Sequence, residues 1–252
     1  MPDWLLPPAD LTLSPHQVHI WRAALDLPPE VVQQIGTFLA DDERARARRF
    51  HFERDRRRFT VGRGVLRLIL SRYLKIIPDE IQLSYGPQGK PYLSEPPLPG
   101  SLLFNVSHSH ELALIAFTDH REIGIDVEYL RPMPDLEAIA THFFARQETE
   151  TLLNLPTNQQ IEGFFNCWTR KEAYIKAIGQ GLTMPLDQFD VSLAPGQPAA
   201  MLNNYQNPDE VSRWSLTAFV PASNYVAAVA VEGNDWQPAF FQWTLTQEVV
   251  QK

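Results

Sequence analysis

The chain has 252 residues, of which 44% are hydrophobic, and a net charge of −8 at neutral pH. This composition predicts a folded globular protein, and the acidic balance argues against general nucleic-acid binding. No apolar run reaches the roughly 18 residues of a membrane span, and the first residues lack a secretory signal, so we expect a cytoplasmic protein without membrane contacts. The single cysteine, Cys167, excludes an internal disulfide, and its aromatic neighbours favour a packed thiol over a nucleophile.

Arginine is concentrated in one part of this acidic chain. Eleven arginines lie from Arg44 to Arg72, where Glu53 and Asp55 are the only acids. One interpretation is the solvated face of a helix, and the other is a site for phosphates or an acidic partner. The sequence alone leaves both open.

Hydrophobic periodicity predicts the elements of the first part of the chain. Residues 41–74 have a helical pattern, which indicates two helices or one broken helix. Residues 85–91 are rich in glycine and proline and predict a turn. Three short apolar segments at 102–107, 112–117 and 123–128 then predict a meander of antiparallel strands.

The same order of elements recurs in the second part. Helical patterns cover 136–153 and 159–178, and strand patterns cover 214–220 and 225–231. The tail from residue 235 has no clear periodicity, although its aromatic residues are expected to pack on the body. The repeat predicts an α+β fold of two similar α/β halves, residues 1–118 and 119–252.

Three carboxylates are the first candidates for chemistry. Asp126 and Glu128 are two residues apart in an apolar strand, so their side chains share a face. Burying both raises the pKa of at least one unless a cation accompanies them. Glu172 falls within the apolar stripe of the helix at 159–178. Strand-end acids facing water, and a surface pair of Glu172 with Lys176 worth about 0.3–0.5 kcal/mol, are the simpler alternatives.

Three oxygen ligands favour Mg²⁺, a hard cation that commonly binds phosphates. Lys171 and Lys176 would then neutralise a pyrophosphate, and His108 follows a strand at a position suited to reach a ligand. His108 and His110 with the acids suggest zinc instead, but the oxygen donors and lysines favour magnesium. Serine hydrolysis is disfavoured because the region of Ser107 lacks a G-x-S-x-G elbow.

Four motifs in sequence order give the chain a family resemblance. They are Gly89-Lys90-Pro91, Phe104-Asn105-Val106-Ser107-His108-Ser109, Gly124-Ile125-Asp126-Val127-Glu128 and Trp168-Thr169-Arg170-Lys171-Glu172-Ala173-Tyr174-Ile175-Lys176. With them the chain resembles the Sfp-type (surfactin-synthetase-activating) 4′-phosphopantetheinyl transferases from about residue 41 to 193. The resemblance implies two α/β halves about a pseudo-twofold axis, with coenzyme A bound in the cleft between them.

The resemblance also implies the roles of residues in the metal and catalytic site. The implied Mg²⁺ ligands are Asp126, Glu128 and Glu172. Glu172, directly or through a metal-bound water, would accept the proton of the attacking serine, and Lys176 would lie beside the bond that breaks. His108 and Lys171 would contact the pyrophosphate of coenzyme A.

The nucleotide part of coenzyme A is implied to contact the first half of the chain. Positions near its 3′-phosphate are matched by Arg46 and Arg58, with Arg49 nearby. Positions near its adenine are matched by Gly89, Lys90, Pro91 and Ser107. Glu43 departs from the pattern, because some members have a basic residue there, so the 3′-phosphate would depend more on Arg46 and its neighbours.

The implied reaction moves phosphopantetheine from coenzyme A to a serine of an apo acyl carrier protein or peptidyl carrier domain and releases 3′,5′-ADP. Two other functions stay open at this point. One is another metal-dependent phosphoryl or nucleotidyl transferase, although no Walker motif or kinase signature is present. The other is a non-catalytic module whose arginine-rich helix holds RNA or an acidic protein. Because both halves lie in one chain, a monomer is expected.

Overall fold

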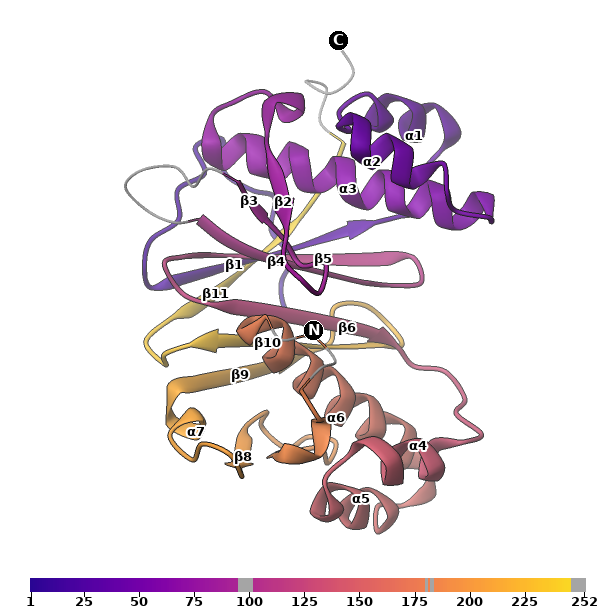
Figure 1. Ribbon diagram of the computed structural model, residues 1–252, viewed down its shortest axis with the longest axis vertical. Helices are drawn as coiled ribbons and strands as arrows, with labels where there is room; N and C mark the ends of the chain where they lie inside the picture. The colour runs from indigo at the N-terminus through magenta and orange to yellow at the C-terminus, as the bar shows by residue number, and fades with distance from the viewer. Residues whose placement is uncertain (95–101, 180, 182–183, 246–252) are drawn as a thin grey trace.

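The computed structural model describes residues 1–94, 102–179, 181 and 184–245. Two halves are stacked along the long axis, and each consists of a sheet covered by helices (Figure 1). The two sheets lie in the middle, between a helical layer containing α3 (Glu53–Leu74) and one containing α6 (Thr157–Ile178). This arrangement confirms the predicted α+β class. None of the helices in the described part of the chain is long and apolar enough to cross a membrane.

The first half is built on a four-stranded sheet with the order β11-β1-β5-β4. Its strands are β1 (Gln17–Ala24), β4 (Leu102–Ser109), β5 (Leu112–Asp119) and β11 (Gln237–Gln242). Its other elements are α1 (Pro29–Gly36), α2 (Asp41–Ala47), α3, a 3₁₀ turn at Pro78–Glu80 and the hairpin of β2 (Leu83–Tyr85) with β3 (Pro91–Leu93). The predicted helical region is thus two helices, with a break between α2 and α3.

The second half is built on a three-stranded antiparallel sheet with the order β6-β10-β9. Its strands are β6 (Ile123–Tyr129), β9 (Trp214–Phe219) and β10 (Tyr225–Glu232). Around it lie α4 (Leu136–Phe143), α5 (Arg146–Leu153), α6, a 3₁₀ turn at Leu186–Gln188, the strand pair β7 (Phe189–Val191) and β8 (Met201–Asn204), and α7 (Glu210–Arg213). Helix α6 ends at Gly179, whose φ of 71° is the left-handed conformation that glycine adopts without strain.

One expectation about the strands is wrong. Strands β4, β5 and β6 were expected to form one antiparallel meander, and β4 does pair with β5 in that way. Strand β6 instead pairs with β10 in the second sheet. The alternation of apolar residues indicates that a strand is half-buried, but it does not specify which neighbour the strand pairs with.

Three hydrophobic clusters hold these layers together. One lies between α3 and the first sheet, and another lies between α6 and the second sheet. The third joins the two sheets through aliphatic side chains of β1, β5, β6 and β10, including Ile20, Leu114, Ile125 and Val229. Each fully buried aliphatic side chain contributes about 1.5–3 kcal/mol, so this shared cluster fixes the position of one half against the other.

The chain crosses between the halves more than once. The predicted division between residues 118 and 119 falls at the end of β5, where the chain leaves the first sheet. Strand β11, near the C-terminus, then returns to the first sheet and pairs with β1 in parallel. Aromatic residues of the tail from residue 235 pack on the body as expected, since Trp236 and Phe241 are both buried.

Candidate active site

The three predicted carboxylates come from two elements that pack against each other. Asp126 and Glu128 lie on β6, and Glu172 lies on α6. Gly124 allows the close packing, because a Cβ atom there would lie 2.0 Å from the carbonyl oxygen of Ala173 on α6. The charges of Asp126 and Glu128 both raise the pKa of Glu172, so the three carboxylates lie within electrostatic reach of one another.

This cluster has an excess of negative charge in a partly buried place. Burial, and then the charge of Asp126, raise the pKa of Glu128. The same two causes, in the same order, raise the pKa of Glu172. Oδ2 of Asp126 and Oε1 of Glu172 are buried and have no hydrogen-bond partner within the described residues. Buried carboxylate oxygens without partners are unfavourable, so the cluster is suited to a cation.

Lys176 places a positive charge next to the carboxylates. Its Nζ lies 2.6 Å from Oδ1 of Asp126 and also donates to the Ser107 hydroxyl at 3.0 Å. A further bond at 3.3 Å reaches the carbonyl oxygen of Ile125. Lys176 therefore pairs across the helix–strand interface with Asp126, and the simple alternative of a surface pair with Glu172 does not describe it.

Ser107 is placed differently from its expected role beside adenine. Its hydroxyl donates to Oδ1 of Asp126 at 2.8 Å, and it accepts from Val127 N at 3.3 Å and from Lys176. A hydroxyl has one donor and two acceptor positions, so every one of them is used inside the protein. In this structure the Ser107 hydroxyl holds Asp126 and Lys176 and has no capacity left for adenine.

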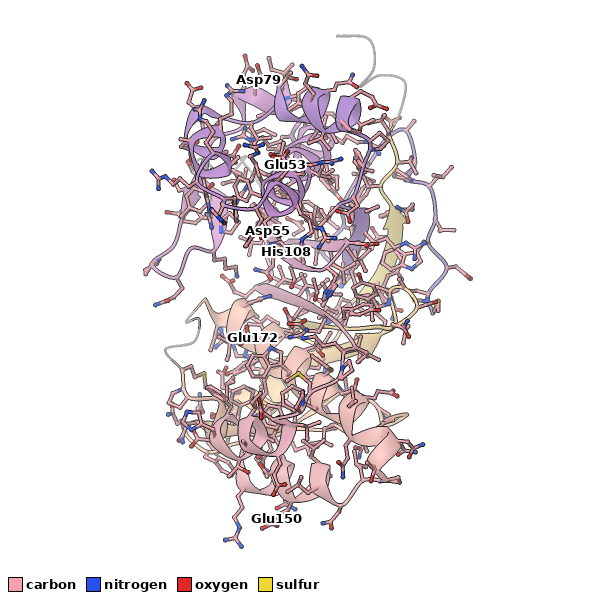
Figure 2. All side chains as sticks on the ribbon, turned by 90° about the vertical axis from the view of Figure 1, so that its right-hand side faces the viewer. Glu53, Asp55, Asp79, His108, Glu150 and Glu172 are labelled. Atoms are coloured by element: carbon pink, nitrogen blue, oxygen red, sulfur yellow. The ribbon has the colours of Figure 1, made fainter. Side chains whose placement is uncertain are left out.

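His108 and Glu172 belong to opposite halves (Figure 2). His108 is the next residue after Ser107 on β4, and the alternation of the strand turns it outward, so it is exposed while Ser107 is buried. The imidazole of His108 is thus exposed at this edge, and its contact with a pyrophosphate stays a prediction.

The predicted pyrophosphate contact of Lys171 disagrees with the structure. The Lys171 side chain is 0% exposed, and its Nζ lies 2.8 Å from Oε2 of the buried Glu148. It also donates to the backbone carbonyls of Leu186 and Phe189. The physical reason is helix geometry, since consecutive residues are about 100° apart around the axis, so Glu172 and Lys171 project in different directions.

The three predicted arginines differ in how accessible their charges are. Arg46 and Arg49 are exposed at the end of α2 and just beyond it, and Arg46 lies over the ring of Phe59. Arg58 forms a two-bond ion pair with Asp26, at 2.8 and 2.6 Å, which raises the Arg58 pKa. Arg46 and Arg49 thus present their charges to solvent, whereas Arg58 is already neutralised in part.

Glu43, the departure from the family pattern, is a buried structural acid. Its carboxylate lies 2.6 Å from Arg67 and 3.4 Å from Arg63. Arg63 was not among the predicted site residues, yet its Nη1 is buried without a hydrogen-bond partner in the described part of the chain. Its guanidinium also lies over the ring of Tyr85 in β2. The helical spacing of α3 places Arg63 and Arg67 one turn apart on one face, a signal that could have identified the pair.

The β2–β3 hairpin carries Gly89, Lys90 and Pro91 to the end of α6. Nζ of Lys90 donates to the carbonyl oxygens of Lys176 at 2.7 Å and Ile123 at 3.2 Å. Burial lowers the pKa of Lys90. The ammonium group of Lys90 therefore holds the hairpin against the end of α6.

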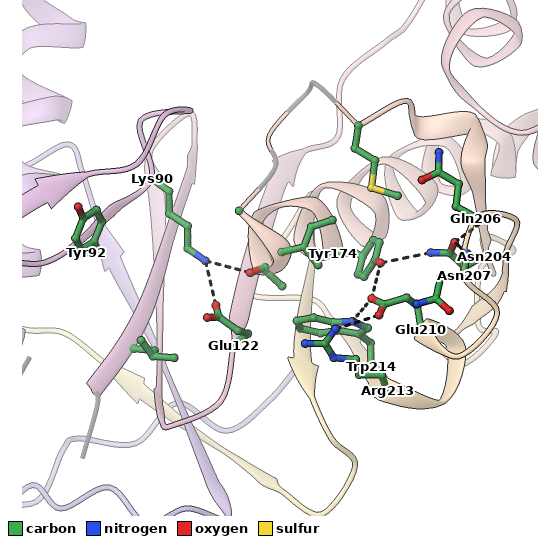
Figure 3. Close-up of a pocket in the computed structure, with 15 residues that line it drawn as sticks. Lys90, Tyr92, Glu122, Tyr174, Asn204, Gln206, Asn207, Glu210, Arg213 and Trp214 are labelled. Atoms are coloured by element: carbon green, nitrogen blue, oxygen red, sulfur yellow. Dashed lines mark hydrogen bonds and ion pairs between the residues drawn. The ribbon is translucent and has the colours of Figure 1, made fainter. Parts of the chain in front are cut away.

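A cavity of about 780 Å³ adjoins this contact. Lys90, Tyr92 and Glu122 line one side of it, and α6 and α7 line the other (Figure 3). On the second side Glu210 accepts hydrogen bonds from Tyr174 at 2.9 Å and Trp214 at 2.7 Å. None of the three acids of the proposed metal site is among the residues that line it.

The three carboxylates are chemically suited to bind a metal ion, although in this structure they are not arranged as a closed metal site. Within the described residues, no three His, Cys, Asp or Glu side chains are arranged to hold an ion. The two buried carboxylate oxygens without partners are nevertheless hard donors of the kind Mg²⁺ binds.

Comparison with known proteins covers both halves of the chain. Residues 28–120 match the family model "4′-phosphopantetheinyl transferase, N-terminal", and residues 122–230 match that of the 4′-phosphopantetheinyl transferase superfamily. The chain is 46% identical over 240 residues to the 4′-phosphopantetheinyl transferase HetI of Nostoc sp., covering 95% of this chain and 98% of HetI. It is 35% identical over 191 residues to the 4′-phosphopantetheinyl transferase Sfp of Bacillus subtilis, covering 75% of this chain and 83% of Sfp.

A solved structure, the holo-[acyl-carrier-protein] synthase of Thermotoga maritima, is similar with a TM-score of 0.34 and 19% identity over 44% of this chain and 62% of that chain. This likeness is too partial to add to the sequence matches. The extended matches to HetI and Sfp confirm the predicted family. This chain belongs to the 4′-phosphopantetheinyl transferase family, and it is an enzyme that transfers the phosphopantetheine group of coenzyme A.

Proposed function

We propose that this enzyme transfers phosphopantetheine from coenzyme A to a serine of an apo acyl carrier protein or peptidyl carrier domain, and releases 3′,5′-ADP. The observation that carries the proposal is the cluster of Asp126, Glu128 and Glu172 beside Lys176. Three coupled carboxylates next to an ammonium group suit a reaction that needs charge neutralisation and alignment on a pyrophosphate.

Asp126, Glu128 and Glu172 are the proposed ligands of Mg²⁺. The two buried oxygens without partners in the described residues support this assignment. When bound, Mg²⁺ would neutralise charge on the pyrophosphate oxygens of coenzyme A.

Glu172 is the proposed general base, and Lys176 stabilises the leaving group. The serine Oγ forms a bond to the β-phosphorus of coenzyme A while the bond from that phosphorus to the bridging oxygen breaks. The electron pair leaves with 3′,5′-ADP, and the serine proton passes to the Glu172 carboxylate. Lys176 places its positive charge near the departing phosphate.

The first half is proposed to bind the nucleotide of coenzyme A. Arg46 and Arg49 are exposed and would contact the 3′-phosphate, while Arg58 would do so only by leaving Asp26. His108, which is exposed at the end of β4, would contact the pyrophosphate. Since the Lys90 ammonium group donates to a backbone carbonyl of α6, the Gly89–Pro91 turn would contact adenine through its backbone.

The test is a transfer assay with coenzyme A, Mg²⁺ and purified apo carrier proteins, followed by mass spectrometry of the carrier. We expect the wild type to add one phosphopantetheine group, and Glu172→Gln to be slower by about 10²–10⁴-fold, as for loss of a general base. Glu162→Gln, an exposed residue of the same helix, is the matched control and should keep wild-type rates. Near-normal transfer by Glu172→Gln would disprove the base role, and no modification of any carrier by the wild type would disprove the function.

Removal of the metal tests the proposed ligands. Protein stripped with a chelator should lose transfer and recover it with added Mg²⁺. Because a ligand that binds only the folded state stabilises it, Mg²⁺ should raise the melting temperature of the wild type but not of Asp126→Asn. An equal rise in both proteins would show that Asp126 is not a ligand.

We also propose that the enzyme acts as a monomer. One chain supplies both the exposed arginines and the carboxylate cluster, so a second copy is not required to complete the site. Light scattering coupled to gel filtration should give the mass of one chain, about the 28.8 kDa of its sequence.

A further inference from the structure

Strands β4 and β6 lie side by side at the junction of the two halves, each at the edge of its own sheet. Their connection is made by side chains of β4. Asn105 Oδ1 accepts a hydrogen bond from Ile125 N at 2.9 Å, and Ser109 Oγ accepts one from Tyr129 N at 3.2 Å. Ser107, between them, does the same for Val127 N. We call Asn105, Ser107 and Ser109 the polar seam.

The period of the strand explains why the seam has this composition. Asn105, Ser107 and Ser109 are alternate residues, so they project from the same face of β4, and all three are buried. Backbone N–H groups of a buried strand edge need acceptors, and the seam supplies them where a neighbouring strand would normally do so. Because side chains stand between the strands, β4 and β6 are joined without being merged into one sheet.

Each of the two serines of the seam also donates to a carboxylate, and Asn105 makes no such contact within the described residues. Ser107 Oγ donates to Oδ1 of Asp126 at 2.8 Å, and Ser109 Oγ donates to Oε2 of Glu128 at 2.9 Å. Each serine hydroxyl thus binds the carboxylate of one acid of β6 and the backbone N–H group of the residue after that acid. Because the backbone N–H group holds the hydroxyl in place, the hydrogen bond from that hydroxyl restricts the carboxylate to one orientation.

Glu128 depends on this contact more than Asp126 does. Asp126 is also held by Lys176 at 2.6 Å. Within the described residues, the other partner of Glu128 is Arg131 at 3.5 Å, and the Arg131 side chain is 45% exposed. An exposed, long ion pair orients a carboxylate weakly, so the buried Ser109 hydroxyl is the stronger constraint.

We propose that Ser109 is a positioning residue, which orients Glu128 for the metal site, while Asn105 only joins the halves. This inference rests on the proposed function, in which Glu128 is a Mg²⁺ ligand. Residues that hydrogen-bond metal ligands commonly change metal affinity by about 10–100-fold when they are removed. Ser109 is therefore expected to act on cation affinity, and not on coenzyme A binding.

The experiment compares Ser109→Ala, Ser109→Thr and Asn105→Ala with the wild type. Binding of Mn²⁺ to the full chain without coenzyme A is measured by electron paramagnetic resonance, and KM values for Mg²⁺ and coenzyme A are measured separately. Ser109→Ala should bind Mn²⁺ about 10–100-fold more weakly and raise the KM for Mg²⁺, with the KM for coenzyme A near the wild-type value. Ser109→Thr, which keeps the hydroxyl, should bind Mn²⁺ like the wild type.

Asn105→Ala separates positioning from joining. It removes one seam bond of the same kind without touching a carboxylate, so it should lower the melting temperature and leave Mn²⁺ affinity unchanged. Wild-type Mn²⁺ affinity in Ser109→Ala, or an equal loss in Asn105→Ala, would overturn the proposal. If Ser109→Ala does not fold, Ser109→Cys replaces it, since a thiol donates weakly, and weaker Mn²⁺ binding is again expected. A wild type that transfers nothing and binds no Mn²⁺ would instead disprove the proposed function.

Discussion

Lys171 and Glu148 form an ion pair that is completely enclosed by protein. Their side chains are 0% and 2% exposed, and Glu148 also accepts backbone hydrogen bonds from Ala145 and Val191. A buried pair with this many partners is tolerated, but removing one member leaves the other without compensation. Lys171 thus has a structural role one residue before the proposed catalytic Glu172.

Lys171→Met tests this role against the phosphate contact expected from the sequence. The variant should lower the free energy of unfolding by about 3–5 kcal/mol, measured by urea denaturation, because the Glu148 carboxylate stays buried. The double variant Lys171→Met with Glu148→Gln should recover part of the loss. An unchanged stability together with a raised KM for coenzyme A would contradict the structural role.

His19 makes stability depend on pH. It is buried on β1, and its Nδ1 lies 2.9 Å from the hydroxyl of Tyr73. Tyr73 in turn accepts a hydrogen bond from the indole of Trp21 at 3.0 Å. Burial lowers the pKa of His19 from 6.5 to about 4.

The direction of this pH dependence follows from proton uptake on unfolding. Between pH 6.5 and about 4 the unfolded chain binds a proton at His19 that the folded protein does not bind, so acid favours unfolding. Stability should therefore fall as the pH drops through this range, by up to about 3 kcal/mol from this residue. His19→Gln should flatten the dependence in denaturation curves, while the exposed His51→Gln should not. Equal pH dependence in wild type and His19→Gln would contradict the assignment.

At the scale of elements, the packing of α6 on β6 determines the site. Gly124 is the point of contact, since a Cβ atom there would meet the Ala173 carbonyl oxygen at 2.0 Å and the Ala177 nitrogen at 2.4 Å. Both are backbone atoms, which cannot move without moving the helix. The helix carries Glu172 and Lys176, so its distance from β6 sets how they meet Asp126.

Gly124→Ala should therefore damage stability and activity together. Overpacking of this kind costs about 1–3 kcal/mol or more, and the displaced helix should separate Glu172 from Asp126. Thermal unfolding and the transfer assay measure the two effects. Gly62→Ala is the matched control, because its Cβ atom would lie 3.5 Å from Leu25, an ordinary contact, and should be neutral or slightly stabilising. Wild-type transfer by Gly124→Ala would show that the close approach is not required.

At the scale of the molecule, the two halves share a core and a strand. Strand β11 follows the second sheet in sequence, yet it pairs with β1 of the first sheet. On β11 the ring of Phe241 packs against Trp21 at a centroid distance of 5.1 Å and against His19 at 5.0 Å. Together with the cluster between the sheets, this crossing predicts that the halves unfold as one unit.

Phe241→Ala tests whether the two halves unfold as one unit. Loss of this buried phenylalanine should lower the free energy of unfolding by about 3–5 kcal/mol. The whole protein should still unfold in a single calorimetric transition, at a lower temperature. Phe52→Ala, at a residue that is 63% exposed, should change stability by no more than about 0.5 kcal/mol. Two separate transitions, with only one of them lowered by Phe241→Ala, would show that the halves are independent.

The local sequence pattern predicts part of the site and of the fold. The period of two placed Asp126 and Glu128 on one face, and the motifs together identified the family. The pattern did not identify β1, and it did not place β6 in the second sheet, because pairing depends on residues about a hundred positions away, as the pairing of Asp126 with Ala228 shows.

The sequence by itself determined the family and the α+β class, because these depend on residue identity and short spacing, while the catalytic and metal-binding residues stay a prediction. Only the tertiary structure decided what each charged group faces. Lys171 pairs with Glu148, Lys176 with Asp126, and Ser109 with Glu128. Side chains one residue apart on a helix or strand point in different directions, and whether each direction leads to core, partner or cleft is set by elements distant in the chain.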